Sequence, residues 1–423
     1  MSDFRYITTA LLNTNPLYNN PILAELPLTN VTFDVQLNSI GTFTGEMLLS
    51  GLDAQKLNIL NGTNPGQTCL YVDYGGKIIW GGVIWQRDYD SATQMLKITG
   101  QEMLSYFKRR KITPLNTSYY NSGGVTPTSI TYTNTDICTV ANDLLVNYTA
   151  LVNYPNQGGT RYGSIGLRGS STIAGFKVTR TYFDYELKEV YQAVKDLSDG
   201  LDSSSATPFF DFCITYSYDG SGNPVKQFTM LKPYQSYTGS NPVFQFPGNL
   251  AEYSYSEDAT NTANALIGLG YGANANKEIA VALDNDYSNS GSINSTNGNA
   301  AILEDIQSFV DVQDPALLKA LTLGQLNARS GITLPDTGKP YISAPEVLQV
   351  VLPPYVDPYL GTFAVGDFAR VILQDDRFPS GYDYLKWRVH IISVEPGENG
   401  ASRVTVTLSR AIYNLGTSWL VTQ

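Results

Sequence analysis

Residues 71–86 read YVDYGGKIIWGGVIWQ, and this stretch decides how the rest of the chain is interpreted. The alternation of polar and apolar residues over Thr68–Tyr74 predicts a strand. Gly75 and Gly76 supply the positive φ angles of a tight hairpin turn. The return strand, Lys77–Gln86, is apolar on both faces, whereas a strand with one wet face alternates. The hairpin is therefore expected to bury one face in its own core and the other against a second domain or subunit.

Further strands are predicted on both sides of this hairpin. Residues 31–37 and 43–49 alternate with a period of two, and so do residues 94–99. Short helices are expected within 53–60 and 101–107. Five or so short antiparallel strands in about 80 residues predict a small closed or nearly closed barrel.

The middle of the chain, residues 113–245, has a different pattern. Asp136 is a good N-cap for one helix, and a second helix is expected to run from near Asp184 to Asp199-Gly200. Two strands follow, at 209–216 and 225–231. These elements predict a separate α+β lobe.

Strand patterns return from residue 246 onward. Weak strands are expected at 251–255 and 279–282, a helix opens at Asp314-Pro315, and the last strands are expected at 347–352, 368–374, 387–394 and 403–409. The order strand, turn, strand, turn, strand in 68–99 is echoed in 368–408, although the residue identities differ. A duplicated barrel is therefore one hypothesis. The predicted class is mainly β with α+β insertions, divided into 1–112, 113–245 and 246–423, with a helical and loop insertion at about 284–340.

The composition limits the partners. The 423 residues carry a net charge of −11, only 15 % are charged, and 29 are tyrosine. The longest basic run is Lys108–Lys111, which disfavours stable nucleic-acid binding. An acidic surface would repel DNA. Such repulsion suits a conduit through which DNA slides without binding. A surface of uncharged polar residues and aromatics suits wide, permanent contacts.

Cysteine and hydropathy patterns disfavour other classes. Cys69, Cys138 and Cys213 are odd in number and form no CxxC pair, which disfavours a disulfide framework and a thiolate metal site. Cys69 and Cys213 lie in apolar runs and are expected to be buried thiols. The N-terminus is no signal peptide, and no apolar run reaches membrane-spanning length. The chain is expected to be made in a cytoplasm and to have no membrane anchor.

Catalytic patterns are weak. His390 is the only histidine, it lies within a predicted strand, and neither GxSxG nor HExxH occurs. Asp375-Asp376 and Glu304-Asp305 remain formal carboxylate pairs for a glycosidase. Gly268–Gly272 is expected to be a glycine-rich turn or bulge, and Asp284–Asp286 lacks the glycine and distal glutamate of a calcium loop. We therefore expect no catalytic residue, no metal, no cofactor and no enzyme.

Two groups of side chains are candidates for a subunit interface. Trp80, Trp85 and Tyr89 favour either core packing or subunit contact, with sugar stacking a smaller alternative. Lys108, Arg109 and Arg110 are expected to form either a solvated helix end or a contact with an acidic neighbouring subunit.

The segment from Tyr71 to Ile112 resembles the minor tail proteins of long-tailed phages of actinobacteria. The resemblance lies in a hairpin motif that leads to a strand and then to a helix ending in Phe107 and basic residues; the hairpin motif is carried by Tyr71, Val72, Asp73, Gly76, Ile79, Trp80, Gly81 and Gly82. Residues 41–45 (GTFTG) and 366–376 (GDFARVILQDD) also look similar to that family.

This resemblance implies a tail-tip hub of the kind found in contractile baseplates and long flexible tails. Such hubs are homotrimers with two tube-like β-barrels per subunit, so that three copies form a pseudo-sixfold ring. The ring adapts the sixfold tail tube and distal tail ring to threefold tip proteins. The implied partners are sister copies, the distal tail ring, the tape-measure protein, further tip or fibre proteins and passing genomic DNA; the implied location is the virion tail tip.

Some relatives carry a C-terminal peptidase or sugar-binding extension. This chain stops at Gln423, directly after the last predicted strand, which favours a hub without one. Two alternatives remain. One is a receptor-binding module for cell-wall glycans, and the other is a cell-wall hydrolase.

Overall fold

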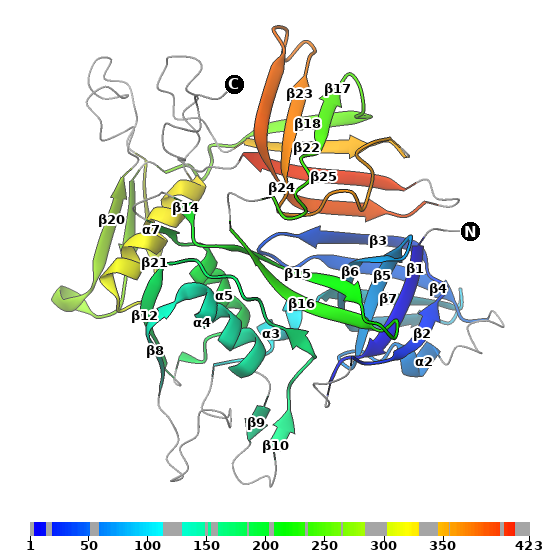
Figure 1. The fold of residues 1–423 in the computed structure, drawn as a ribbon, viewed down its shortest axis with the longest axis horizontal. Helices are drawn as coiled ribbons and strands as arrows, with labels where there is room; N and C mark the ends of the chain where they lie inside the picture. The colour runs from blue at the N-terminus through cyan, green and yellow to red at the C-terminus, as the bar shows by residue number, and fades with distance from the viewer. Residues whose placement is uncertain are drawn as a thin grey trace.

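The fold of the chain is mainly β in the computed structural model (Figure 1). One sheet of 13 strands contains strands from both ends of the chain. The structure describes residues 4–13, 19–50, 59–112, 129–148, 151–153, 160–183, 186–202, 207–232, 236–263, 265–283, 303–329, 346–354, 356–397 and 402–410.

The strands near the N-terminus form what we call the N-terminal unit. Their order in the sheet is β3-β4-β7-β6-β5-β1-β2. The predicted hairpin strands are present, because β5 matches the predicted 68–74 and β6 extends the predicted 77–86. The bounds are β1 Phe4–Ala10, β2 Ile22–Leu26, β3 Thr29–Gln36, β4 Thr42–Leu48, β5 Thr68–Tyr74, β6 Lys77–Asp90 and β7 Met95–Glu102.

The strands near the C-terminus form the C-terminal unit. Their order is β18-β22-β25-β24-β23-β17. The bounds are β17 Val243–Phe246, β18 Glu252–Glu257, β22 Glu346–Leu352, β23 Phe368–Leu373, β24 Tyr382–Glu395 and β25 Arg403–Arg410. The predicted strands 347–352, 368–374, 387–394 and 403–409 are therefore confirmed.

The two units repeat one strand order. The antiparallel run β3-β4-β7-β6-β5 corresponds in chain order to β18-β22-β25-β24-β23. The units differ at one end, because β1 runs antiparallel to β5 whereas β17 runs parallel to β23. The echo expected from the sequence is thus a repeat of topology.

The repeat extends to the register of the longest strand in each unit. Strands β6 and β24 both have 14 residues. The sixth residue of each faces the last residue of the next strand, in the pairs Gly82↔Glu102 and Trp387↔Arg410. The register shifts at the ninth residue of each, which is Trp85 in β6 and His390 in β24. Equal registers with equal bulges identify the two units as copies of one motif.

A glycine contact repeats as well. Gly66 N–H donates to Ile84 O at 2.7 Å, and Gly366 N–H donates to Val389 O at 2.9 Å. Both acceptors directly precede the bulge. Both glycines have positive φ angles, of 71° and 89°, which a residue with a Cβ rarely adopts.

The strand pairing does not show the two expected barrels as closed. Among the described strands the pairing is an open path that ends at β18 and β2. The outer edge of β3 is not used to close its own unit, because residues 33–36 pair with residues 391–394 of β24. We call this pairing the unit junction.

The lobe lies between the units in sequence. Its helix α4 (Ile137–Asn142) begins at Asp136, whose side chain accepts from Cys138 N–H as predicted, and the 143–148 turn continues it as a π-helix. Helix α5 (Val190–Ser198) begins later than expected. The main strands are β8 Ser129–Asp136, β12 Lys177–Phe183, β15 Asp211–Tyr218 and β16 Pro224–Leu231. A short helix, α3 (Leu104–Lys108), joins the N-terminal unit to the lobe.

The insertion in the C-terminal half is a small sheet covered by a helix (Figure 1). Helix α7 (Pro315–Arg329) packs on β19 (Ala265–Leu269) and β20 (Ile279–Leu283), with β21 (Glu304–Ser308) beside β19. Asp314 caps the helix, since its Oδ1 accepts from Ala316 N–H at 2.9 Å. No helix in the described ranges is both long enough and apolar enough to cross a membrane.

Candidate functional site

The hairpin β5–β6 separates two hydrophobic cores and contributes one face to each of them. Leu70, Val72, Trp80 and Ile84 belong to the core shared by the two units. The alternate residues Cys69, Tyr71, Ile78 and Val83 belong to the core of the lobe. The sequence left open whether a domain or a subunit covers the second face. Within the chain, the lobe covers it.

The contact between lobe and hairpin depends on Gly81. The Tyr216 hydroxyl donates to Gly81 O at 2.6 Å. A Cβ at Gly81 would lie 2.6 Å from the Tyr216 ring and 2.8 Å from the Tyr71 ring. The glycine therefore permits a close approach between β15 and β6, and burial holds the pKa of Tyr216 well above its usual range.

A buried ion pair fixes the lobe at the unit junction. Arg388 of β24 binds Asp211 of β15 at 2.7 Å, and the side chains are only 1 % and 7 % exposed. Asn38 Nδ2 donates to the other Asp211 oxygen at 2.6 Å, and Phe212 N–H donates to Asn38 Oδ1 at 2.6 Å. Each of the three residues Asn38, Asp211 and Arg388 belongs to a different part of the chain, so this cluster holds N-terminal unit, lobe and C-terminal unit together.

Glu102 lies buried near the same place. Its carboxylate accepts from Gly41 N–H at 2.6 Å. Burial raises its pKa to about 8, and the nearby Asp34 adds to the shift. Below this pKa the Glu102 carboxyl group is mostly protonated and neutral, which lowers the cost of burying it.

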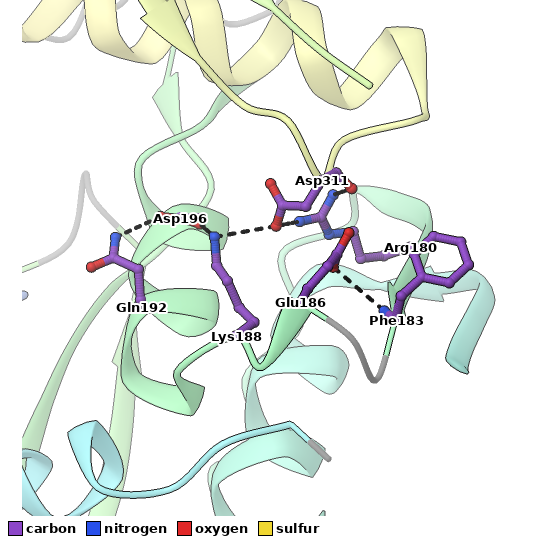
Figure 2. A network of polar contacts seen from close by, with 7 residues as sticks. All are labelled: Arg180, Phe183, Glu186, Lys188, Gln192, Asp196 and Asp311. Atoms are coloured by element: carbon purple, nitrogen blue, oxygen red, sulfur yellow. Dashed lines mark hydrogen bonds and ion pairs between the residues drawn. The ribbon is translucent and has the colours of Figure 1, made fainter. Parts of the chain in front are cut away.

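A second polar network ties the insertion to the lobe (Figure 2). The Arg180 guanidinium of β12 donates two hydrogen bonds to Asp311. One goes to the backbone oxygen at 2.6 Å and the other to the carboxylate at 2.5 Å. Lys188 lies 3.2 Å from the same carboxylate and 2.5 Å from Asp196 of α5. The two cations hold the pKa of Asp311 below its usual range against the opposing effect of burial. Asp311 is therefore the link between the lobe and the loop before α7.

The predicted interface residues occupy different environments. Trp80 is fully buried, and its Nε1 donates to Asp34 O at 3.0 Å. Of the two alternatives expected for Trp80, the structure therefore shows core packing, because the hairpin turns this face into the core. Trp85 is half-buried, donates to Ser105 Oγ at 2.7 Å and lies 5.2 Å from the Arg109 guanidinium. Tyr89 is 54 % exposed.

The basic run after β7 packs on aromatic rings. The Lys108 ammonium lies 5.4 Å from the Tyr191 ring, and the Arg110 guanidinium lies 5.9 Å from the Tyr106 ring. These cations therefore have partners within the lobe and α3. Lys108 and Arg109 keep exposed surface, and their role in a subunit interface stays a prediction.

The geometry gives no support to the catalytic candidates. The surroundings of His390 lower its pKa to about 4, mainly by excluding water from the ring, which keeps it neutral near neutral pH. Asp375 accepts from the Tyr253 hydroxyl, which holds its pKa below the usual range. A glycosidase acid needs a raised pKa instead. Asp305 pairs with Arg329 at 3.0 Å, and Asp284–Asp286 lies outside the described residues.

Cysteines and glycines have structural roles. Cys69, Cys138 and Cys213 are all buried, as expected for two of them, and burial raises the pKa of Cys138 and of Cys213 to about 12. A Cβ at Gly268 would lie 1.9 Å from Thr322 Oγ1 of α7, so this glycine allows the helix to approach β19. Among the described residues no group of three or more potential metal ligands gathers.

An open pocket lies at the outer end of the C-terminal unit. It has a volume of about 400 Å³. Aromatic rings line it together with Asp375 and Arg377, whose guanidinium lies 5.6 Å from the Tyr255 ring. Its lining residues are Phe246, Ala251, Glu252, Tyr253, Tyr255, Asp375 and Arg377.

Known structures share this fold. The 43 kDa tail protein of prophage MuSo2 from Shewanella oneidensis is 11 % identical with a TM-score of 0.52, and the alignment covers 96 % of this chain and 98 % of that one. The tail protein from Neisseria meningitidis MC58 is 12 % identical with a TM-score of 0.48, and 96 % of each chain is covered. Prophage tail protein gp18 from Listeria monocytogenes EGD-e is 12 % identical with a TM-score of 0.45, covering 98 % and 96 %.

At these identities the likeness concerns the fold alone, and the Shewanella protein carries it. The expected resemblance to phage tail proteins is confirmed at the level of the fold. The actinobacterial origin has no support among these three proteins. No protein-family model and no curated protein sequence matches the chain.

Proposed function

We propose that the chain is a structural subunit of a phage tail, the hub at the tail tip. Three copies form a ring, and the two units of each copy supply six similar segments around its axis. The ring joins the sixfold tail tube and distal tail ring to threefold tip proteins and lines part of the DNA ejection channel.

The observation that carries this proposal is the repeated unit. Strand order, register, bulge and glycine contact recur between β3–β7 and β18–β25. A chain with two equivalent segments presents a sixfold pattern when three copies close a ring. The fold shared with a prophage tail protein supports the same function.

The unit boundaries belong to this proposal. We assign 1–112 and 246–423 to the two tube-like units and 113–245 to a lateral lobe, except that β17, which begins at Val243, belongs to the second unit. We also propose that each unit closes into a barrel. Side-chain packing supports this for the C-terminal unit, where Phe246 of β17 and Tyr253 of β18, at opposite ends of the strand order, have ring centroids 5.3 Å apart.

The proposed partners are sister copies, the distal tail ring, the tape-measure protein and further tip or fibre proteins. DNA passes without stable binding, in line with a net charge of −11. The location is the virion tail tip, after synthesis in the host cytoplasm.

Counting copies around the axis tests the proposal. Cryo-electron microscopy or mass photometry of the full chain, at the highest concentration it tolerates, is expected to give rings of three. A persistent monomer, or a ring of another copy number, would overturn it.

The pocket favours one alternative, a glycan-binding role. Aromatic faces beside an acidic and a basic side chain are a common lining for saccharide sites, and Tyr253 and Asp375 are already bonded to each other there. Titration with soluble cell-wall saccharides tests this role. Binding that Tyr253→Ala abolishes would support it, and no binding would exclude it.

A further inference from the structure

The two units also differ in the strand contact that forms the unit junction. In the C-terminal unit, Ile391–Val394 of β24 pair with Phe33–Gln36 of β3. The equivalent stretch of β6, Gln86–Tyr89, pairs among the described strands only with β7. The equivalent of β3 is β18, whose single partner among the strands that the structure describes is β22. The unit junction joins β24 to β3. Their equivalents in the repeat, the described strands β6 and β18, are not paired with each other.

Exposure differs in the same places. Ile392 and Val394 are 5 % and 1 % exposed and belong to the core shared by the two units. The equivalent residues by register are Arg87 and Tyr89, and Tyr89 is 54 % exposed. A large aromatic residue exposed where its structural copy is buried marks a position at which a neighbour is missing.

The repeat also fixes the register of the missing contact. Phe43 of β4 faces Gly100, the sixth residue of β7, and Leu348 of β22 faces Leu408, the sixth residue of β25. Phe43 and Leu348 are thus equivalent. Phe33 faces Phe43, whereas Tyr255 faces Leu348, which makes Phe33 and Tyr255 equivalent as well.

We propose that Gln86–Tyr89 of one copy pair with Tyr255–Asp258 of the next copy, antiparallel and in the register of the unit junction. The opposed pairs are Tyr89 with Tyr255, Asp88 with Ser256, Arg87 with Glu257, and Gln86 with Asp258. This inference rests on the ring proposed above and names the contact that closes it.

The chemistry of the opposed side chains fits such pairing. Directly opposite residues on antiparallel strands interact, and opposite charges or two aromatics stabilise the pair. Arg87 faces an acidic residue, Tyr89 faces another tyrosine, and no two like charges face each other. Because no described strand pairs with either edge, pairing also satisfies backbone groups that would otherwise bond to water.

A cysteine pair tests the register. Asp88→Cys with Ser256→Cys places two thiols opposite each other across the proposed contact, while the native cysteines are buried. Mild oxidation of the full chain is expected to link copies into covalent dimers and closed trimers on a non-reducing gel. The matched control is Asp88→Cys with Ser254→Cys, since Ser254 is exposed on the same strand two residues away. The control should link several-fold less.

The outcomes separate the contact from the function. Rings of three in which the 88/256 pair fails to link, or links no better than the 88/254 pair, would overturn this contact and leave the hub intact. Absence of rings in the unsubstituted chain would remove both. Tyr89→Asp gives a second measure. It should lower the fraction of trimer at least about tenfold without changing the Tm, and an unchanged trimer fraction would count against the contact.

Discussion

Tyr216 of the lobe donates a hydrogen bond to the backbone oxygen of Gly81, at 2.6 Å, in the middle of the hairpin that separates the two cores. The residue type at position 81 therefore determines whether the lobe can seat on the N-terminal unit. The close approach of β15 to β6 depends on the absence of a Cβ atom at this position.

Gly81→Ala is expected to destabilise the chain by about 1–3 kcal/mol, because the added methyl group overlaps two aromatic rings. Tyr216→Phe removes only the hydrogen bond and should cost about 1 kcal/mol. Urea unfolding measures both. Gly220→Ala is the matched control, since a Cβ there meets nothing within 4 Å. Equal losses at 81 and 220 would contradict the close approach.

Arg388→Met should cost about 3–5 kcal/mol, because it leaves the buried Asp211 carboxylate without its cation. Arg370→Met is the control. Arg370 pairs with Asp383 at 2.5 Å, but both side chains are more than 40 % exposed, at 43 % and 49 %. Such surface pairs contribute less than about 1 kcal/mol. A similar loss from both substitutions in urea unfolding would show that the junction pair is not special.

Asp311→Asn is expected to loosen the insertion from the lobe. It removes the charge that Arg180 and Lys188 share and leaves Arg180 buried without a counter-ion. Hydrogen exchange, read by mass spectrometry, should speed up in peptides covering α7. Asp383→Asn provides the control, because Asp383 is 49 % exposed in its pair with Arg370 and belongs to the C-terminal unit. Unchanged exchange in α7 would refute a linking role for Asp311.

Glu102 predicts a pH dependence of stability. Its pKa is about 8 in the folded chain, against 4.5 for an ordinary glutamate. Between these values the folded state binds the extra proton, so the free energy of unfolding should fall as pH rises, by up to about 1.4 kcal/mol per pH unit. Glu102→Gln should flatten the curve in this window. Glu395→Gln, at an exposed position, should leave it parallel to that of the unsubstituted chain. Parallel curves for all three proteins would contradict the shifted pKa.

The sequence predicted elements whose signal is local. The period-two pattern located β3 and β5, the Gly75-Gly76 turn and the apolar run after it located β6, and Asp136 located the start of α4. Strand β8 was missed because its only buried residue is Ile130, so no alternation of apolar residues marks it. Its pairing with β12 comes from a partner more than 40 residues away, in the pair Ile130↔Tyr182.

The contacts around the hairpin were less predictable than its strands, because they come from residues that are distant in the sequence. Two apolar faces on Lys77–Gln86 indicated that something covers the hairpin, but nothing local identified Tyr216 as the residue that does. For Trp80 the sequence leaves core packing and subunit contact open, because an indole in a strand gives no sign of which face is buried in the core. The Arg388–Asp211 pair spans 177 positions, and its charges resemble ordinary surface charges when each is considered alone.

The unit junction has a consequence for biosynthesis. Residues 33–36 leave the ribosome early, whereas their partners at 391–394 are translated near the C-terminal end of this sequence. Throughout elongation the first unit therefore presents an unpaired strand edge, which is a template for aggregation with other nascent chains. Translation rate and chaperone supply should thus influence the yield of this protein more strongly than the stability of its finished fold does.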